Sequence, residues 1–200
     1  MISLIDHQVG RIRIALRERG LDKNTILVYS TDHGDWLGDH GLLLKGPMAY
    51  EGLLRVGLLF EGPGVPAGKV VQDPVSTLDL AQTFCDYAKT PMQAGVHSVS
   101  LRPLIETETA SRDFALSEWD LRPSRSGVAL QLRTVRTQGQ KLTLDLISGA
   151  GEMYDLLEDP YEMDNRFGDP AMAAIQKEMT DMIASRPDDA VAPLAQIGMA

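Results

Sequence analysis

The sequence has few cysteines, no long apolar run and a shortage of basic charge. A single cysteine among 200 residues excludes an internal disulfide and favours a reducing compartment. No apolar run reaches the roughly 18 residues that a membrane-spanning helix needs. The N-terminal residues include neither a basic region nor the apolar core of a signal peptide. We therefore expect a cytoplasmic chain that has no membrane partner.

Basic side chains are outnumbered by acidic ones, 19 to 28, which gives a net charge of -9. Nucleic acids and acidic membranes are bound by basic patches, so this balance argues against both as partners. The chain is 44% hydrophobic and 24% charged, as is typical of globular proteins. Its length is enough for one domain with a core, or for a core and a small subdomain.

One stretch combines a predicted strand with a cluster of ionisable residues. The run over residues 25–31 is apolar and β-rich, and Asp32 and His33 follow it directly. Open α/β sheets place their active sites at the carboxyl ends of such strands. Asp32 and His33 could both face one cation, and their oxygen and nitrogen donors suit Mg, Mn, Ca or Zn. The alternative is a polar loop whose acids cap the next helix.

The same stretch carries a longer pattern. Residues 30–41 read Ser-Thr-Asp-His-Gly-Asp-Trp-Leu-Gly-Asp-His-Gly, and Lys45 and Tyr50-Glu51-Gly52 follow. This order resembles the metal-binding segment of type I sulfatases. The phosphonate monoester hydrolases, their relatives in the alkaline phosphatase superfamily, share it. Further segments in the family's order lie at residues 62–65, 75–84, 98–104 and 152–165.

The resemblance covers nearly the whole chain but corresponds only to the C-terminal portion of a sulfatase. Family members begin with a strand bearing an Asp-Asp pair. A Cys/Ser-x-Pro-x-Arg motif then supplies the residue that is oxidised to the formylglycine nucleophile. Neither feature occurs in this sequence, because no Pro-x-Arg follows Cys85. The resemblance therefore implies a portion of a sulfuric ester hydrolase that is inactive alone.

Two other functions remain open at the level of sequence. A phosphonate or phosphodiester hydrolase portion would carry the same residues as a sulfatase portion. A non-catalytic module would depend on a partner, either the missing N-terminal half or a second copy of the chain. The small-molecule partner implied by the resemblance is a sulfate or phosphonate ester.

The resemblance assigns roles to three residues, Asp32, His33 and Lys45, and leaves His40 ambiguous. Asp32 and His33 would be ligands of a divalent cation, Ca, Mn or Mg. This chain alone would bind it weakly, because two ligands do not replace a hydration shell. Lys45 would neutralise the charge of the ester and ease departure of the alkoxide; the alternative is a solvated lysine. His40 would either reach the leaving group or lock the loop by a hydrogen bond to a backbone carbonyl.

Periodicity predicts the elements of an α/β fold. Apolar residues spaced three and four apart predict a helix over residues 2–19 whose apolar stripe needs a sheet to lie on. The patterns also predict a strand at 56–60 and a helix over 73–88, with Leu78, Leu80, Ala81, Phe84 and Ala88 facing inward. Strand-like runs at 114–119, 128–136, 141–146 and 153–156 predict an antiparallel sheet of about four strands, and a last helix is expected over 170–184.

We divide the chain accordingly. Residues 1–112 should form the C-terminal part of a sulfatase-like or alkaline-phosphatase-like α/β core, with an incomplete sheet, helices and the metal loop. Residues 113–185 should form an antiparallel sheet packed by the terminal helix. Residues 186–200 should be a loose tail, because Pro187 and Pro193 interrupt it.

Overall fold

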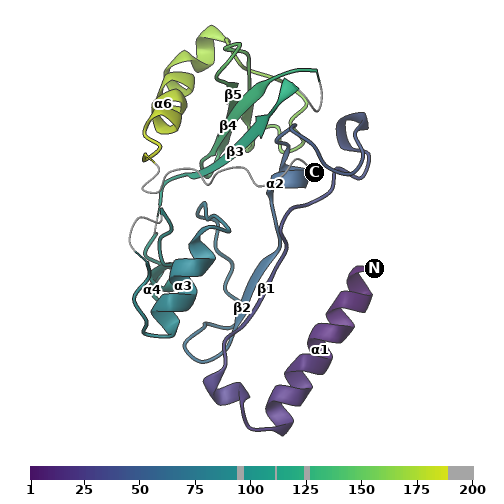
Figure 1. Ribbon diagram of the computed structural model, residues 1–200, viewed down its shortest axis with the longest axis vertical. Helices are drawn as coiled ribbons and strands as arrows, with labels where there is room; N and C mark the ends of the chain where they lie inside the picture. Colours follow the sequence, from purple (N-terminus) through teal and green to yellow (C-terminus); the bar gives the residue numbers. More distant parts are fainter. Residues whose placement is uncertain (94–96, 111, 124–126, 189–200) are drawn as a thin grey trace.

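A computed structural model describes residues 1–93, 97–110, 112–123 and 127–188. Figure 1 shows an elongated molecule with a four-stranded sheet and helix α6 (Ala173–Ala184) toward one end. Helix α1 (Ile2–Glu18) extends toward the other end. The predicted α/β class is confirmed, since the chain has antiparallel sheets, helices and a helix at the C-terminal side.

The four-stranded sheet is a meander in which neighbouring strands are antiparallel and follow in chain order. Its strands are β3 (Ala115–Leu121), β4 (Leu130–Arg136), β5 (Gln140–Asp145) and β6 (Gly151–Asp155). These are the four strands that the alternating pattern predicts. The β4–β5 turn is closed by a hydrogen bond of 2.9 Å from the Thr137 amide to the Gln140 carbonyl oxygen.

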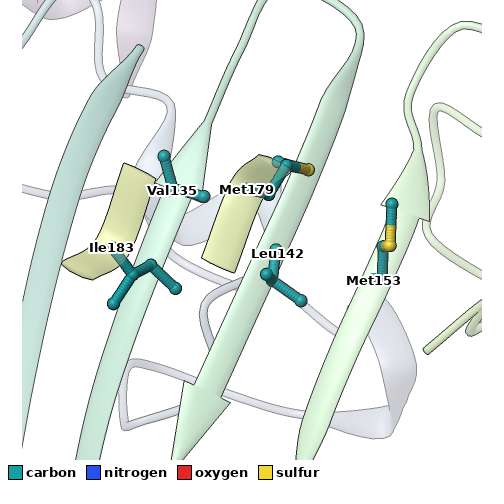
Figure 2. Packing of buried hydrophobic residues seen from close by; sticks show 5 residues of the cluster. All are labelled: Val135, Leu142, Met153, Met179 and Ile183. Atoms are coloured by element: carbon teal, nitrogen blue, oxygen red, sulfur yellow. The ribbon is translucent and has the colours of Figure 1, made fainter. Parts of the chain in front are cut away.

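The main hydrophobic core lies between this sheet and α6. The strand register places Val135, Leu142 and Met153 side by side on β4, β5 and β6, and all three are fully buried. Met179 and Ile183 of α6 pack on this row, as Figure 2 shows. The predicted terminal helix is thus confirmed. It begins as a 3-10 turn (Pro170–Met172) and continues as α6, with its methionines serving as core filler.

Asp145 ties the end of β5 to the start of β4. Its carboxylate accepts hydrogen bonds from the Ser148 hydroxyl at 2.6 Å and the Gln131 amide at 2.9 Å. These bonds, with that from Ser148 the strongest, lower the pKa of Asp145 to about 2. A carboxyl group in an unfolded chain has a pKa of about 3.9. Ionised Asp145 therefore stabilises the fold above about pH 4, and this contribution is lost as the pH falls toward 2.

We accordingly predict that Asp145→Asn flattens the acid dependence of stability. The urea midpoint of the wild-type chain should fall between pH 4 and pH 2, and that of the variant should fall less steeply. Ser148→Ala should reduce the slope in part, because it removes the strongest of the bonds to Asp145. Urea unfolding followed by far-ultraviolet circular dichroism measures both. A wild-type slope in Asp145→Asn would contradict the assignment.

The N-terminal region contains a second, smaller sheet. Strand β1 (Leu27–Ser30) pairs antiparallel with β2 (Leu58–Glu61), at the two places where strands were predicted. The remaining helices are α2 (Glu51–Leu54), α3 (Asp79–Tyr87) and α4 (Arg102–Thr107), together with the short 3-10 segments Asp22–Asn24 and Asp39–Gly41.

Helix α3 differs from the prediction in its start and in its buried face. It begins at Asp79, and its buried residues are Asp79 and Thr83, whereas Leu78 and Phe84 are about half exposed. The inward apolar face that we predicted is therefore wrong. Hydrogen bonds explain why polar residues are buried here. The Asp79 carboxylate accepts a hydrogen bond from the Val99 amide at 3.0 Å. The Thr83 hydroxyl oxygen accepts one from the Leu101 amide at 2.8 Å.

Helix α1 forms where predicted, but its apolar stripe is not covered. Ile2, Ile5 and Ile12 are 84%, 40% and 50% exposed, and the helix has no buried residue. Its anchor to the small sheet is an ion pair of 2.8 Å between Arg13 and Glu61. A sheet of two strands offers little surface to a helix of 17 residues. Within the described part of the chain, no helix has the length and apolarity needed to cross a membrane.

Candidate functional site

Three of the four predicted site residues lie together near the end of β1, two directly after the strand and Lys45 on a loop that folds back. His33 Nε2 lies 2.9 Å from the Lys45 ammonium and 3.6 Å from Asp32 Oδ2. The side chains of Asp32 and His33 are 87% and 39% exposed, so the cluster opens to solvent. Asp32 and Lys45, which are 13 positions apart in the sequence, thus both lie close to one imidazole nitrogen of His33.

The hydrogen bonds of His33 fix which nitrogen is available as a ligand. Nδ1 lies 2.6 Å from the Gly34 carbonyl oxygen. A carbonyl oxygen only accepts, so this contact assigns the ring proton to Nδ1. Nε2 keeps its lone pair and accepts from the Lys45 ammonium. The nitrogen that faces Asp32 and Lys45 is therefore the one able to bind a metal.

Asp32 is held in its ionised form. The His33 amide donates to Asp32 Oδ1 at 3.0 Å, and this bond is the main reason why the pKa of Asp32 is lowered. The positive charge of Lys45 lowers this pKa as well, by a smaller amount. An anionic oxygen beside an imidazole lone pair is a suitable donor pair for a divalent cation.

The donor set fits a cation, although only in part. Metal–ligand bonds of about 2.0–2.4 Å allow one ion to reach two donors that are 3.6 Å apart. Among the described residues, no group of three or more His, Cys, Asp or Glu side chains is arranged to hold a metal. Asp32 and His33 could therefore supply two donors to a cation, and the described residues add no third.

Lys45 reaches the site because the chain folds back on itself between Trp36 and Leu44. The Trp36 amide donates to the Leu44 carbonyl oxygen at 3.1 Å, which closes the loop. The Trp36 ring is buried and lies directly against Gly46, where an added Cβ would come within 2.7 Å of it. This contact holds Gly46, the residue that follows Lys45, against the Trp36 ring.

His40 lies apart from this cluster. Its ring stacks on Tyr50, with centroids 3.7 Å apart and planes 6° from parallel. Both side chains line a cavity of about 360 Å³, with Asp39, Glu51, Gly52, Pro160, Tyr161, Glu162 and Met163. The stacking holds the loop against Tyr50, whereas the lock that we predicted was a hydrogen bond. Its two predicted roles, leaving-group contact and loop lock, stay predictions.

Helix α2 supports the loop that carries His33. The Gly34 amide donates to the Leu53 carbonyl oxygen at 2.8 Å. A Cβ on Gly34 would lie 2.0 Å from the Gly52 carbonyl oxygen, so only glycine allows the two backbones to approach this closely. Gly34 therefore uses its amide to hold α2 and its carbonyl to hold the His33 ring.

Sequence reasoning missed a buried ionic network behind α2. Lys141 of β5 and Glu162 are 1% and 3% exposed and form an ion pair. Burial lowers the pKa of Lys141, while the charges of Glu162 and Glu51 oppose this shift. The sequence contained two signals of this network. Lys141 is the immediate neighbour of the core residue Leu142 in a predicted strand, and Glu162 lies within the 152–165 segment of the resemblance.

Comparisons with known proteins identify the family of the chain. Residues 38–188 match the family model described as N-sulphoglucosamine sulphohydrolase, C-terminal. The Δ4,5-hexuronate-2-O-sulfatase of Bacteroides thetaiotaomicron is 31% identical over 196 residues, 94% of this chain and 40% of that protein. The chain therefore belongs to the sulfatases, as a member of this C-terminal family.

Solved structures show the same likeness. The phosphonate monoester hydrolase of Agrobacterium radiobacter superposes with a TM-score of 0.82 at 30% identity, over 92% of this chain and 39% of that one. A structure in complex with its substrate D-glucosamine-2-N,6-O-disulfate superposes with a TM-score of 0.76 at 32% identity, over 92% of this chain and 38% of that one. The chain thus spans about two fifths of the length of the relatives it matches.

Proposed function

We propose that this chain is the C-terminal part of a metal-dependent sulfuric ester hydrolase, and that Asp32 and His33 bind its divalent cation. The observation that carries the proposal is the convergence of Asp32 Oδ2 and the Lys45 ammonium on His33 Nε2, at 3.6 and 2.9 Å. Membership of the sulfatase family supports it. Calcium, manganese and magnesium are the candidate ions.

Each residue has a defined task in this proposal. Asp32 and His33 hold the cation, which when bound polarises the ester oxygen as a Lewis acid. Nε2 has one lone pair, so a cation bound to it would take the place of the contact between Lys45 and His33. The Lys45 ammonium is then available to neutralise the oxygens of the sulfate group.

The chain supplies charge neutralisation but no nucleophile. No Cys/Ser-x-Pro-x-Arg motif occurs in it. Catalytic groups act non-additively, and loss of the nucleophile removes most of the rate enhancement. We therefore expect no ester hydrolysis by this chain alone. The exposed apolar stripe of α1 supports contact with an N-terminal half or with a second copy. The cytoplasmic location stays a prediction.

The substrate is proposed to be a sulfated small molecule. One relative is named for a hexuronate 2-O-sulfate, and one structural neighbour holds a sulfated glucosamine. A phosphonate ester is the alternative, because the TM-score of 0.82 to a phosphonate monoester hydrolase favours it as well. Asp32, His33 and Lys45 would serve either anion.

Calorimetric titration of the chain with Mn²⁺ and Ca²⁺ tests the metal role. We expect binding in the micromolar to millimolar range, because two protein ligands leave most of the shell to water. Asp32→Ala and His33→Ala should each abolish it. Asp22→Ala, in the exposed 3-10 turn that precedes β1, is the matched control and should bind as the wild type does. Equal binding by all four chains would contradict the assignment.

A further inference from the structure

We propose that Glu162 and Lys141 of the C-terminal subdomain are positioning residues for His33. They act through α2 on the orientation of the imidazole. The inference rests on the proposed metal role of His33. It extends the site to two residues more than 90 positions away in the sequence, on the far side of α2.

The first step is a set of hydrogen bonds between Glu162 and Lys141 and the backbone at the start of α2. One oxygen of the Glu162 carboxylate accepts the Glu51 amide at 2.7 Å, and the other pairs with the Lys141 ammonium. The same ammonium donates to the Ala49 carbonyl oxygen at 2.6 Å. Arg136 adds a contact of 3.4 Å to the Glu51 carboxylate. The backbone on both sides of Tyr50 is thus held by side chains of the larger sheet and its following loop.

The second step leads from α2 to the imidazole. The last turn of α2 presents the Leu53 carbonyl oxygen to the Gly34 amide at 2.8 Å. The carbonyl oxygen of the same Gly34 accepts from His33 Nδ1 at 2.6 Å. A shift of α2 therefore moves the peptide groups on both sides of Gly34, and with them the acceptor that sets the ring orientation.

The chemistry of the network explains why ionic residues are used. Each carboxylate oxygen of Glu162 faces a donor, the Glu51 amide on one side and the Lys141 ammonium on the other. A buried ion pair is weak evidence for stability, because hydrophobic residues of equal volume often serve as well. The pair contributes defined geometry instead. It fixes the start of α2 against the sheet at one backbone donor, the Glu51 amide, and at one backbone acceptor, the Ala49 carbonyl oxygen.

Glu162→Gln tests the inference with an isosteric change. An amide side chain has one acceptor oxygen, so it cannot serve both the Glu51 amide and the Lys141 ammonium. Thr143→Val is the matched control. Thr143 lies on the same strand and face as Lys141, and its hydroxyl forms a hydrogen bond of 2.9 Å with Thr134 on the neighbouring strand. Both variants should lower the urea midpoint. Only Glu162→Gln should change the position and stability of the His33 loop.

The readouts are amide hydrogen exchange of Gly34 by NMR and Mn²⁺ affinity of the full chain. In Glu162→Gln we expect Gly34 to exchange about tenfold faster, as local opening becomes easier. Mn²⁺ binding should weaken about threefold or more, since a ligand shifted from its geometry binds less well. Thr143→Val should leave both at the wild-type level. Equal changes in the two variants, or no change in Gly34 exchange, would overturn the inference.

Two further arms keep the outcomes separate. If the wild-type chain does not bind Mn²⁺, the proposed metal role fails, whereas Gly34 exchange still decides whether the network positions the loop. If Glu162→Gln does not fold, Arg136→Gln replaces it, because this side chain, 26% exposed, holds the same helix through Glu51. It should speed Gly34 exchange about threefold, and a wild-type rate would overturn the inference.

Discussion

Leu142→Ala is expected to lower the free energy of unfolding by about 3–5 kcal/mol, the usual cost of a leucine truncation in a well-packed core. Leu142 is fully buried on β5, between Val135 and Met153 on the neighbouring strands. Met179 and Ile183 of α6 cover this row. The site is confined by strands on both sides and by a helix above, so the cavity has little room to collapse.

Urea unfolding, followed by circular dichroism and by the fluorescence of the two tryptophans, Trp36 and Trp119, measures this effect. Leu146→Ala is the matched control, because Leu146 follows the same strand and is 53% exposed. We expect this control to change the free energy by about 0.5 kcal/mol or less. Equal destabilisation by the two variants would show that the row of Leu142 is not the core between the larger sheet and α6.

Gly34→Ala is expected to disrupt the His33 loop by a steric clash. The clash arises from lack of space and not from a left-handed backbone conformation at Gly34. The added Cβ would meet the Gly52 carbonyl oxygen at 2.0 Å and its carbon at 3.0 Å. Both atoms belong to the backbone of α2, so no side chain can rotate to relieve the clash. We expect the free energy of unfolding to fall by about 1–3 kcal/mol, as for other overpacked sites. We also expect complete loss of Mn²⁺ binding.

Gly10→Ala is the control for a glycine in open space. Nothing lies within 4 Å of a Cβ placed on Gly10, which sits inside α1. Alanine is a better helix former than glycine, by about 1 kcal/mol in a helix interior. This variant should therefore stabilise α1 and leave Mn²⁺ binding at the wild-type level. Preserved metal binding in Gly34→Ala would contradict the close contact between the loop and α2.

The elements that the sequence predicts well are those with a regular apolar pattern. The four strands of the larger sheet, the terminal helix and α1 lie where their periodicity places them. The pattern fails for α3, because its buried face carries Asp79 and Thr83 rather than apolar side chains. Those two residues are buried by hydrogen bonds to a segment about 20 positions further along, which no local period encodes.

The site divides in the same way. The adjacency of Asp32 and His33 after a strand is a local property, and the sequence alone identified it. The return of Lys45 depends on the contact between the Trp36 ring and Gly46. The burial of Lys141 looked improbable from its residue type, since lysine is almost never buried unless it is paired.

The sequence by itself thus determined which segments become strands and helices, and which residues carry the donor atoms of the candidate site. Both follow from the order of neighbouring residues. Tertiary structure alone decided how those atoms are held. The Glu51 amide meets Glu162 across 111 positions of chain. Such a contact depends on strand register and on the placement of α2, because the two groups are close only when α2 has packed beside the larger sheet.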